Sequence, residues 1–178
     1  MKLSVPTTHE YAPFYADYIE RATKRDDVFS ALSRQIDELH AALDTLTEPQ
    51  ARFQPGPEEW SIKEVIGHLS DVERVFSYRL LRISRNDATP LPGFEQEDYV
   101  RAAGFDNYAL NDLVCEFEYL RRANVLSIQN MSEEALHRYG TASGVTVSAR
   151  ALIYMLVGHV EHHMASLHEK YLPEAARL

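Results

Sequence analysis

The sequence predicts an all-α protein built as a four-helix bundle. Four long segments repeat apolar residues every three or four positions, which is the period of an amphipathic helix. No comparably long segment alternates apolar and polar residues, as a half-buried strand would. The longest interruption, 85–107, contains several proline, glycine and asparagine residues, and its length predicts a connection that crosses over the bundle between the second and third helices.

The first long helix is expected to follow an N-terminal arm. Residues 1–25 hold several aromatic side chains, which predicts an arm or a short helix that packs on the bundle. Asp26 and Asp27 favour the positively polarised start of the helix that follows, and Pro49 comes after its end. Its apolar stripe comprises Phe29, Leu32, Ile36, Leu39, Leu43 and Leu46.

The second long helix begins at a capping box. Ser61 and Glu64 are three residues apart, so each side chain can accept a hydrogen bond from a backbone N–H that the first turn leaves free. We expect this helix to reach about Ser84, and a short helix near 95–102 to interrupt the crossover.

The third and fourth long helices fill the rest of the chain. The third is expected from Leu110 to about 126, and the stretch 131–146 is expected to be irregular, without a strand of consequence. The fourth is expected to start between 146 and 148 and to end at Tyr171, because Pro173 follows.

Length, composition and charge narrow the class of protein. The 178 residues fit one domain, 1–178, and 45% hydrophobic with 25% charged residues is the balance of a globular protein. The formal net charge of −9 opposes binding to phosphate backbones, so we expect no nucleic-acid partner.

The longest apolar run, 151–157, is far shorter than the ~20 residues of a membrane span, and the first residues lack the apolar stretch of a signal peptide. We therefore expect a cytoplasmic protein without membrane contact, in which the single Cys115 is a small core residue.

Three histidines occupy positions where apolar residues are expected. In the last helix His159 and His163 continue the stripe of Leu152 and Leu156, and residues four apart on a helix can reach one metal ion. His68 lies on a core-directed stripe of the second helix, so three imidazoles could meet inside the bundle and leave one coordination position open. The alternative is that each is a hydrogen-bonded core histidine, although burying three without a ligand would be costly.

Several neighbouring residues are weaker candidates. His162 lies on a different line of the last helix and flanks the site. Asp71 and Glu73 could orient the second ring nitrogen of His68, although surface or capping roles are more common for such residues. Three arginines could hold a carboxylate-bearing thiol, although such residues more often form a solvated face: Arg79, Arg82 and Arg85. Three aromatic residues could line a pocket: Trp60, Phe94 and Tyr99.

An ordered set of motifs resembles the DinB/YfiT-like superfamily. The motifs are WSIKEVIGHL at 60–69 with the acidic residues that follow it, PLPGF at 90–94 and GHVEHH at 158–163, and the similarity runs from about residue 28 to 172. The resemblance implies a four-helix bundle with up-down-down-up connectivity. It also implies a divalent metal ion, nickel or zinc, whose ligands carried over onto this sequence are His68, His159 and His163.

The resemblance leaves three function classes open. Relatives include low-molecular-weight thiol S-transferases and a mycothiol-dependent maleylpyruvate isomerase, so the first expectation is a metal-dependent transferase that uses a small thiol and an electrophilic substrate. A metal-dependent hydrolase is the alternative, and a non-catalytic, stress-related bundle that binds metal or a partner is the third. The sequence assigns no catalytic residue. We also expect a homodimer, because four amphipathic helices and an aromatic arm offer more apolar surface than one small bundle requires, and relatives often dimerise.

Overall fold

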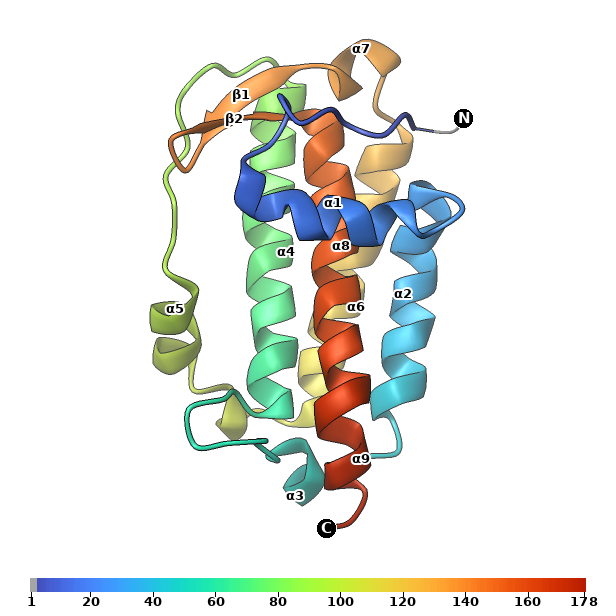
Figure 1. Ribbon diagram of the computed structural model, residues 1–178, viewed down its shortest axis with the longest axis vertical. Coiled ribbons are helices and arrows are strands. Elements are labelled where there is room, and N and C mark those ends of the chain that lie inside the picture. The colour runs from blue at the N-terminus through green and yellow to red at the C-terminus, as the bar shows by residue number, and fades with distance from the viewer. Residues whose placement is uncertain (1–2) are drawn as a thin grey trace.

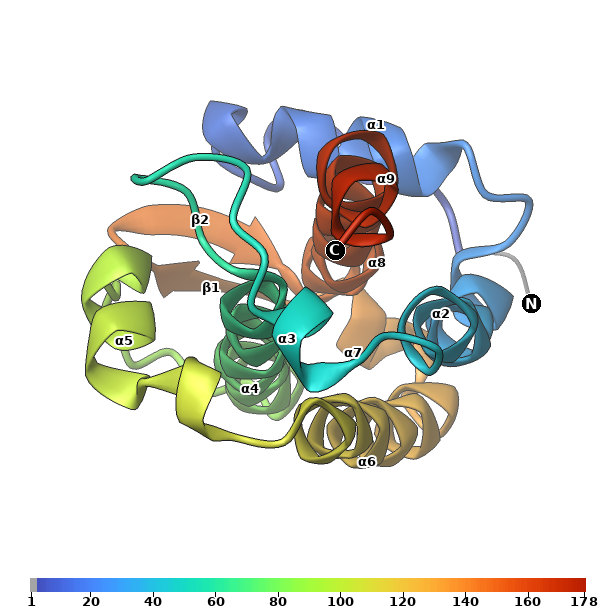
Figure 2. The same cartoon turned by 90° about the horizontal axis from the view of Figure 1, so that it is seen from below.

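The computed structural model describes residues 3–178 as a bundle of four long helices (Figure 1). Helices α2 and α8 run in one direction and α4 and α6 in the other, and the end-on view in Figure 2 gives the order α2, α6, α4, α8 around the bundle. This arrangement confirms the predicted four-helix bundle and its up-down-down-up connectivity. The bounds are α2 (Val28–Leu43), α4 (Ile62–Ser84), α6 (Leu110–Gln129) and α8 (Ala149–Ser166).

The starts of these helices follow the local sequence signals. Asp27 accepts a hydrogen bond from the backbone N–H of Ser30 and caps α2. Ser61 and Glu64 form both halves of the capping box that opens α4. Ser148 caps α8 with a single hydrogen bond, which it accepts from the backbone N–H of Ala151. The apolar faces of all four helices then pack into the core.

The crossover between α4 and α6 runs along the outside of the bundle (Figure 1). It contains α5 (Gln96–Ala103) and a short 3-10 turn, η2 (Phe105–Asn107). The helix expected at 95–102 is therefore present. Before α5, Leu91 exchanges backbone hydrogen bonds with Thr141 and Ser143, which ties the crossover to the segment between α6 and α8.

The stretch between α6 and α8 is regular, contrary to the expectation for 131–146. It contains α7 (Glu133–Leu136) and an antiparallel hairpin of β1 (Tyr139–Ala142) and β2 (Val145–Ser148). Ser143 and Gly144 form its turn, and both have positive φ, as a tight hairpin turn requires. Strands of four residues are too short to produce a clear alternation in the sequence, which is why the hairpin escaped prediction.

The C-terminal helical segment also extends past its expected end. After α8 the chain forms a π-helical turn, η3 (Leu167–Tyr171), and then α9 (Leu172–Ala175). Pro173 lies in the first turn of α9. Backbone N–H groups in a first turn have no intrahelical acceptor, so proline, which has no N–H, costs no hydrogen bond there. The expected end at Tyr171 is therefore wrong. The short helix α3 (Glu48–Ala51), with its own capping box, was likewise not expected.

The N-terminal arm lies across the bundle. It contains η1 (Pro13–Tyr15) and α1 (Ala16–Thr23), and α1 crosses over α8 in Figure 1. The crossing is close because α8 has Gly158 there: a Cβ on Gly158 would lie 1.9 Å from the carbonyl oxygen of Tyr18. The arm is anchored further along by Glu10, which accepts hydrogen bonds from Ser148 (2.7 Å) and Arg150 (2.7 Å).

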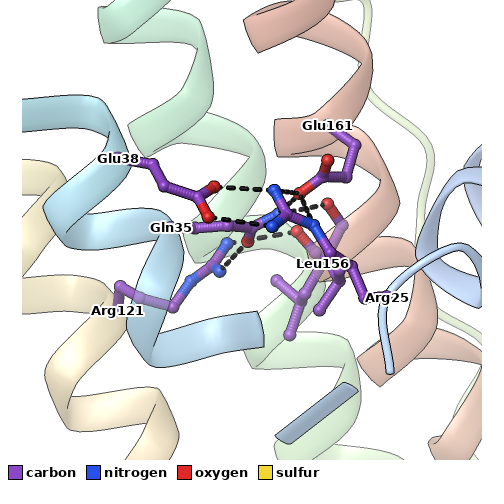
Figure 3. Close-up of polar contacts among 7 residues, drawn as sticks. Arg25, Gln35, Glu38, Arg121, Leu156 and Glu161 are labelled. Carbon is purple, nitrogen blue, oxygen red and sulfur yellow. Dashed lines mark hydrogen bonds and ion pairs between the residues drawn. The ribbon is translucent and has the colours of Figure 1, made fainter. Parts of the chain in front are cut away.

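A buried network of polar side chains joins the four helices, and Figure 3 shows the part of it around Arg121, Gln35 and Glu161. Arg121 on α6 is fully buried and donates to both carboxylate oxygens of Glu73 on α4, at 2.8 and 2.7 Å. It also donates to Gln35 on α2 at 2.7 Å and to the carbonyl of Leu156 on α8 at 3.1 Å. Gln35 continues the network by donating to Glu161 on α8 at 2.6 Å. Each long helix thus contributes at least one group to a single interior network.

Within residues 3–178, no helix is both long enough and apolar enough to cross a membrane.

Candidate metal centre

Two helices bring three histidines together in the interior. His68 comes from the second turn of α4, and His159 and His163 come from neighbouring turns of α8. The Nε2 atoms of His68 and His159 lie 3.1 Å apart. One ligand nitrogen from each of the three residues lies within 4.8 Å of the other two. The three imidazoles therefore converge on one point, as their positions on the apolar stripes predicted.

Burial keeps these imidazoles neutral. His68 and His159 are 1% and 3% exposed, and His163 is half-buried. Burial lowers the pKa of His68 to about 4 and that of His163 to about 3. Burial also lowers the pKa of His159 well below its usual value, and the neighbouring histidines lower it further. At neutral pH all three therefore have an unprotonated ring nitrogen, which is the form that binds metals.

The donor set fits a divalent metal ion. Two nitrogen ligands of a tetrahedral zinc ion lie about 3.3 Å apart, since each bond is ~2.0–2.1 Å, and the 3.1 Å between His68 and His159 is close to that value. Among residues 3–178 the group that can share one ion consists of the three histidines, without a carboxylate or a thiol. Three neutral ligands leave the charge of an ion uncompensated and leave one tetrahedral position for a further ligand.

Aromatic rings surround the three imidazoles. The ring of Trp60 lies 4.6 Å from that of His68 and is stacked on that of His163 at 6.4 Å, measured between centroids. Tyr18 on the N-terminal arm approaches His159 edge-on at 5.4 Å. These rings shield the imidazoles from water on two sides.

Two cavities reach the histidines. The larger, of about 460 Å³, includes His159 in its lining and lies between α4, the η1 and α1 segments of the N-terminal arm, residues 93–96 and the tip of the hairpin. The smaller, of about 250 Å³, includes His163 and Trp60 and carries three glutamates in its lining. A small molecule in either cavity would therefore border the three-histidine group. We refer to the larger one as the aromatic cavity, because Phe14, Tyr15, Tyr18, Phe76 and Phe94 line it.

Comparison with known proteins identifies the family. A model of the DinB superfamily matches residues 31–167. The chain belongs to the DinB superfamily. Its fold is also similar to that of YfiT from Bacillus subtilis, described as a probable metal-dependent hydrolase with an unusual four-helix bundle topology. The two chains share 15% identity at a TM-score of 0.74, and the match covers 94% of this chain and 93% of YfiT. None of the curated proteins compared with this chain matches it.

The structure separates the weaker candidates from the three histidines of this DinB protein. His162 faces the N-terminal arm, where its Nδ1 lies 3.2 Å from Asp17. Glu73 does not orient His68, because Arg121 and Asn124 occupy its carboxylate. Asp71 lies 3.9 Å from Arg74 instead. Neither acidic residue therefore acts as a hydrogen-bond partner of His68.

The three arginines differ from one another. Arg82 pairs with Asp87 and Arg85 is exposed, in keeping with a solvated face. Arg79 contradicts that interpretation, because it is 3% exposed. Of the aromatic candidates, Trp60 and Phe94 line cavities next to the histidines, and Tyr99 lines a separate small cavity.

Some residues around the site had little or no signal in the sequence. Tyr18 lies next to His159 only because the arm crosses α8, and nothing local in the sequence predicts that crossing. Phe76 could have been found, since it continues the stripe of His68 and Val72 along α4 into the aromatic cavity. Ser143 reaches the same cavity from the hairpin that was not expected.

Proposed function

We propose that this DinB protein is a metal-dependent enzyme that acts on a small molecule bound in the aromatic cavity, with a low-molecular-weight thiol as the attacking group. The observation that carries the proposal is the meeting of three neutral imidazoles, two of them buried and one half-buried, at the border of a cavity large enough for a small substrate. Nickel and zinc are the ions we propose, because both accept imidazole ligands.

The chain's own residues would hold the ion and control access to it. His68, His159 and His163 supply neutral nitrogen ligands, and their burial keeps protons from competing for them at neutral pH. When bound, a divalent ion with an open position supplies a positive charge that lowers the pKa of a thiol or a water molecule held beside it. Tyr18 and Trp60 limit the approach of bulk water to the ligands.

A hydrolase is the second candidate. YfiT, which shares the fold, is described as a probable metal-dependent hydrolase. Within the described residues no carboxylate joins the three-histidine group, so this chain lacks an acidic base in direct contact with the ion's position. That absence is the reason for ranking the thiol reaction first.

The deciding experiment begins with elemental analysis of protein purified without a histidine tag. We expect about one nickel or zinc ion per chain. The protein is then loaded with cobalt and titrated with cysteine and other physiological thiols at neutral pH. We expect a sulfur-to-cobalt charge-transfer band, and transfer of the thiol to the electrophile monochlorobimane. Hydrolysis of para-nitrophenyl acetate without any response to thiols would establish the hydrolase instead.

A matched pair of variants tests the ligand set. His163→Ala should lose most of the bound metal, because it removes one of three ligands. His162→Ala removes the adjacent imidazole, which faces Asp17, and should retain the metal. Circular dichroism should show nearly unchanged helicity for both variants. Equal loss of metal in the two would contradict the assignment.

A further inference from the structure

Arg79 is an exception among the buried charged side chains. Among residues 3–178, the buried lysine, arginine and acidic residues are Glu10, Lys63, Glu73, Arg79 and Arg121. Glu10 pairs with Arg150, Lys63 with Glu48, and Glu73 with Arg121. Arg79 has no carboxylate within ion-pair distance among residues 3–178, although buried charges are rarely left without a counterion because their desolvation is costly.

The partners of Arg79 are neutral and lie at the wall of the aromatic cavity. Its Nη2 donates to the carbonyl oxygen of Pro92 at 2.9 Å and to Oγ of Ser143 at 2.8 Å. Ser143 lines the aromatic cavity, and so does Gly93, the residue after Pro92. The guanidinium therefore lies directly behind one end of that cavity.

The three-histidine group lies at the other end. Arg79 follows His68 by 79 − 68 = 11 residues on α4, which corresponds to roughly 16 Å along the helix axis. Val72 and Phe76, which come between them on the same face of α4, line the cavity, as does His159. The aromatic cavity thus has His159 at one end and Ser143 at the other. Ser143 is hydrogen-bonded to the guanidinium of Arg79, which itself lines a neighbouring small cavity with Pro92.

Ser143 has a backbone conformation that its residue type does not favour. Its φ is 54°, a left-handed value that hairpin turns usually fill with glycine, asparagine or aspartate. Its hydroxyl oxygen accepts the hydrogen bond from Arg79, and the O–H can still donate one hydrogen bond to a group in the cavity that Ser143 lines. The hairpin turn accounts for this conformation, and it places the Ser143 side chain at the cavity lining, against Arg79.

We propose that Ser143 and Arg79 bind the carboxylate of a small ligand whose body fills the aromatic cavity. The Ser143 hydroxyl would donate to the carboxylate, and the guanidinium behind it would supply the balancing charge. Among the described residues, the lining contains no lysine or arginine and only one acidic residue, Glu95, which is exposed. That the other end of the ligand reaches the metal follows only from the proposed function. The carboxylate site itself does not depend on the proposed function.

The test compares two probes of nearly the same size and shape, of which one carries a charged carboxylate and the other a neutral amide. Phenylpropanoate and its neutral amide, phenylpropanamide, are titrated into the purified protein by calorimetry. Wild type should bind the carboxylate roughly tenfold more tightly than the amide, as expected for a hydrogen-bonded charge pair. Arg79→Gln should abolish that preference, and Arg79→Lys should keep part of it. Ser143→Gly, which removes the hydroxyl and suits the positive φ, should reduce it.

Two controls distinguish a carboxylate site at Arg79 from a general effect of charge and from binding to the metal. Arg85→Gln makes the same change in charge at an exposed position at the end of the same helix, and the preference should be unchanged. Removing metal with a chelator should also leave the preference intact, because the carboxylate binds at the opposite end of the cavity. Protein that binds neither nickel nor zinc before any chelator is added, but keeps the preference, would refute the proposed function and leave this inference standing.

Three results would overturn the inference. The first is equal binding of the two probes by wild type. The second is a preference that disappears on chelation but persists in Arg79→Gln, which would place the carboxylate on the metal. The third is an equal loss in Arg79→Gln and Arg85→Gln, which would indicate a general effect of charge. If Arg79→Gln does not fold, Ser143→Gly and Arg79→Lys take its place, and a preference that neither of them reduces would overturn the inference.

Discussion

At the scale of single residues, the distinctive property of the site is that its histidines are kept from protonation. Histidine has an ordinary pKa near 6.5, so exposed histidine ligands begin to lose metal to protons just below neutrality. Burial lowers the pKa of His68 to about 4 and of His163 to about 3. Protons should therefore compete with a metal here only at a much lower pH.

Metal affinity should accordingly be almost independent of pH between about 7 and 5. A lowered pKa means that the folded protein stays unprotonated until the pH approaches about 4, and only then should affinity fall steeply. Zinc dissociation constants measured by competition with a chelator across this range test the expectation. A fall that begins near pH 6.5 would show that the imidazoles titrate like exposed ones.

The same shifts affect the stability of the metal-free protein. Below pH 6.5 the unfolded chain takes up protons on these histidines that the folded chain does not, so the free energy of unfolding decreases as the pH falls toward 4. Helicity should therefore be measured by circular dichroism at each pH of the affinity measurement. A loss of metal caused by unfolding can then be distinguished from protonation of the ligands in the folded protein.

The sequence predicted the central residues of the site but not all of its walls. The register of His159 and His163 follows from helical periodicity alone, and His68 from the stripe of α4. Arg79 was expected on a solvated face, because the charge of an arginine does not reveal that a loop and a hairpin tip will cover it. The missing information in each case is a contact between segments far apart in the chain.

At the scale of elements, the contact between α1 and α8 determines how the arm covers the site. Gly158 lets the backbone of α1 approach α8 next to His159, and Tyr18 is thereby placed against that histidine. Glycine is otherwise unfavourable inside a helix, by about 1 kcal/mol relative to alanine. Its presence in the middle of α8 is explained by this close approach.

Gly158→Ala should therefore destabilise the protein even though it raises helix propensity. A Cβ 1.9 Å from the carbonyl oxygen of Tyr18 forces α1 away from α8, and overpacking of this kind costs about 1–3 kcal/mol. Urea unfolding measures the loss, and faster hydrogen exchange in 13–23 should accompany it. Gly56→Ala is the control, because a Cβ there meets its nearest neighbour at 3.7 Å. A more stable Gly158→Ala would mean that the arm does not pack as described.

The elements that the sequence predicted are those whose own residues specify them. The four long helices carry apolar stripes, and α4 carries a capping box. The hairpin at 139–148 depends on pairing between short strands and on the bond from Leu91 to Thr141, so its stability comes from outside the segment. Helix α9 was missed because Pro173, normally a stop signal, lies in the first turn of a new helix.

At the scale of the whole molecule, the buried network defines how the four helices fit together. Arg121 contacts groups from the other three long helices, so a rotation or slide of any one of them would break at least one of its bonds. Through Glu161 the network also reaches Arg25, which follows α1 and pairs with Glu38 on α2 (Figure 3). The network lies near the three histidines, and the charge of Arg121 contributes to the lowered pKa of His159.

The homodimer and the cytoplasmic location expected from the sequence stay predictions.

The network should therefore be costly to break and much less costly to remove. Arg121→Met leaves the carboxylate of Glu73 buried without its partner, and we expect a loss of about 3–5 kcal/mol in the free energy of unfolding. Glu73→Met should lower the free energy of unfolding by a similar amount, because it leaves the buried guanidinium of Arg121 without a counterion. The double variant removes both charges, so its loss should be smaller than the sum of the two single losses by about 2 kcal/mol or more.

A surface pair provides the control for this cycle. Arg101 and Asp98 form an ion pair in which both side chains are largely exposed, at 75% and 65%, and Arg101→Met should cost less than about 1 kcal/mol. Urea unfolding of the four proteins in the cycle, together with the control, gives the coupling between Arg121 and Glu73 directly. Strictly additive losses would mean that water reaches the pair, and that the helices are aligned by their apolar faces alone. Strong coupling would mean that the buried charges of Arg121 and Glu73, and not the apolar faces alone, fix how α6 lies against α4, the helix that carries His68.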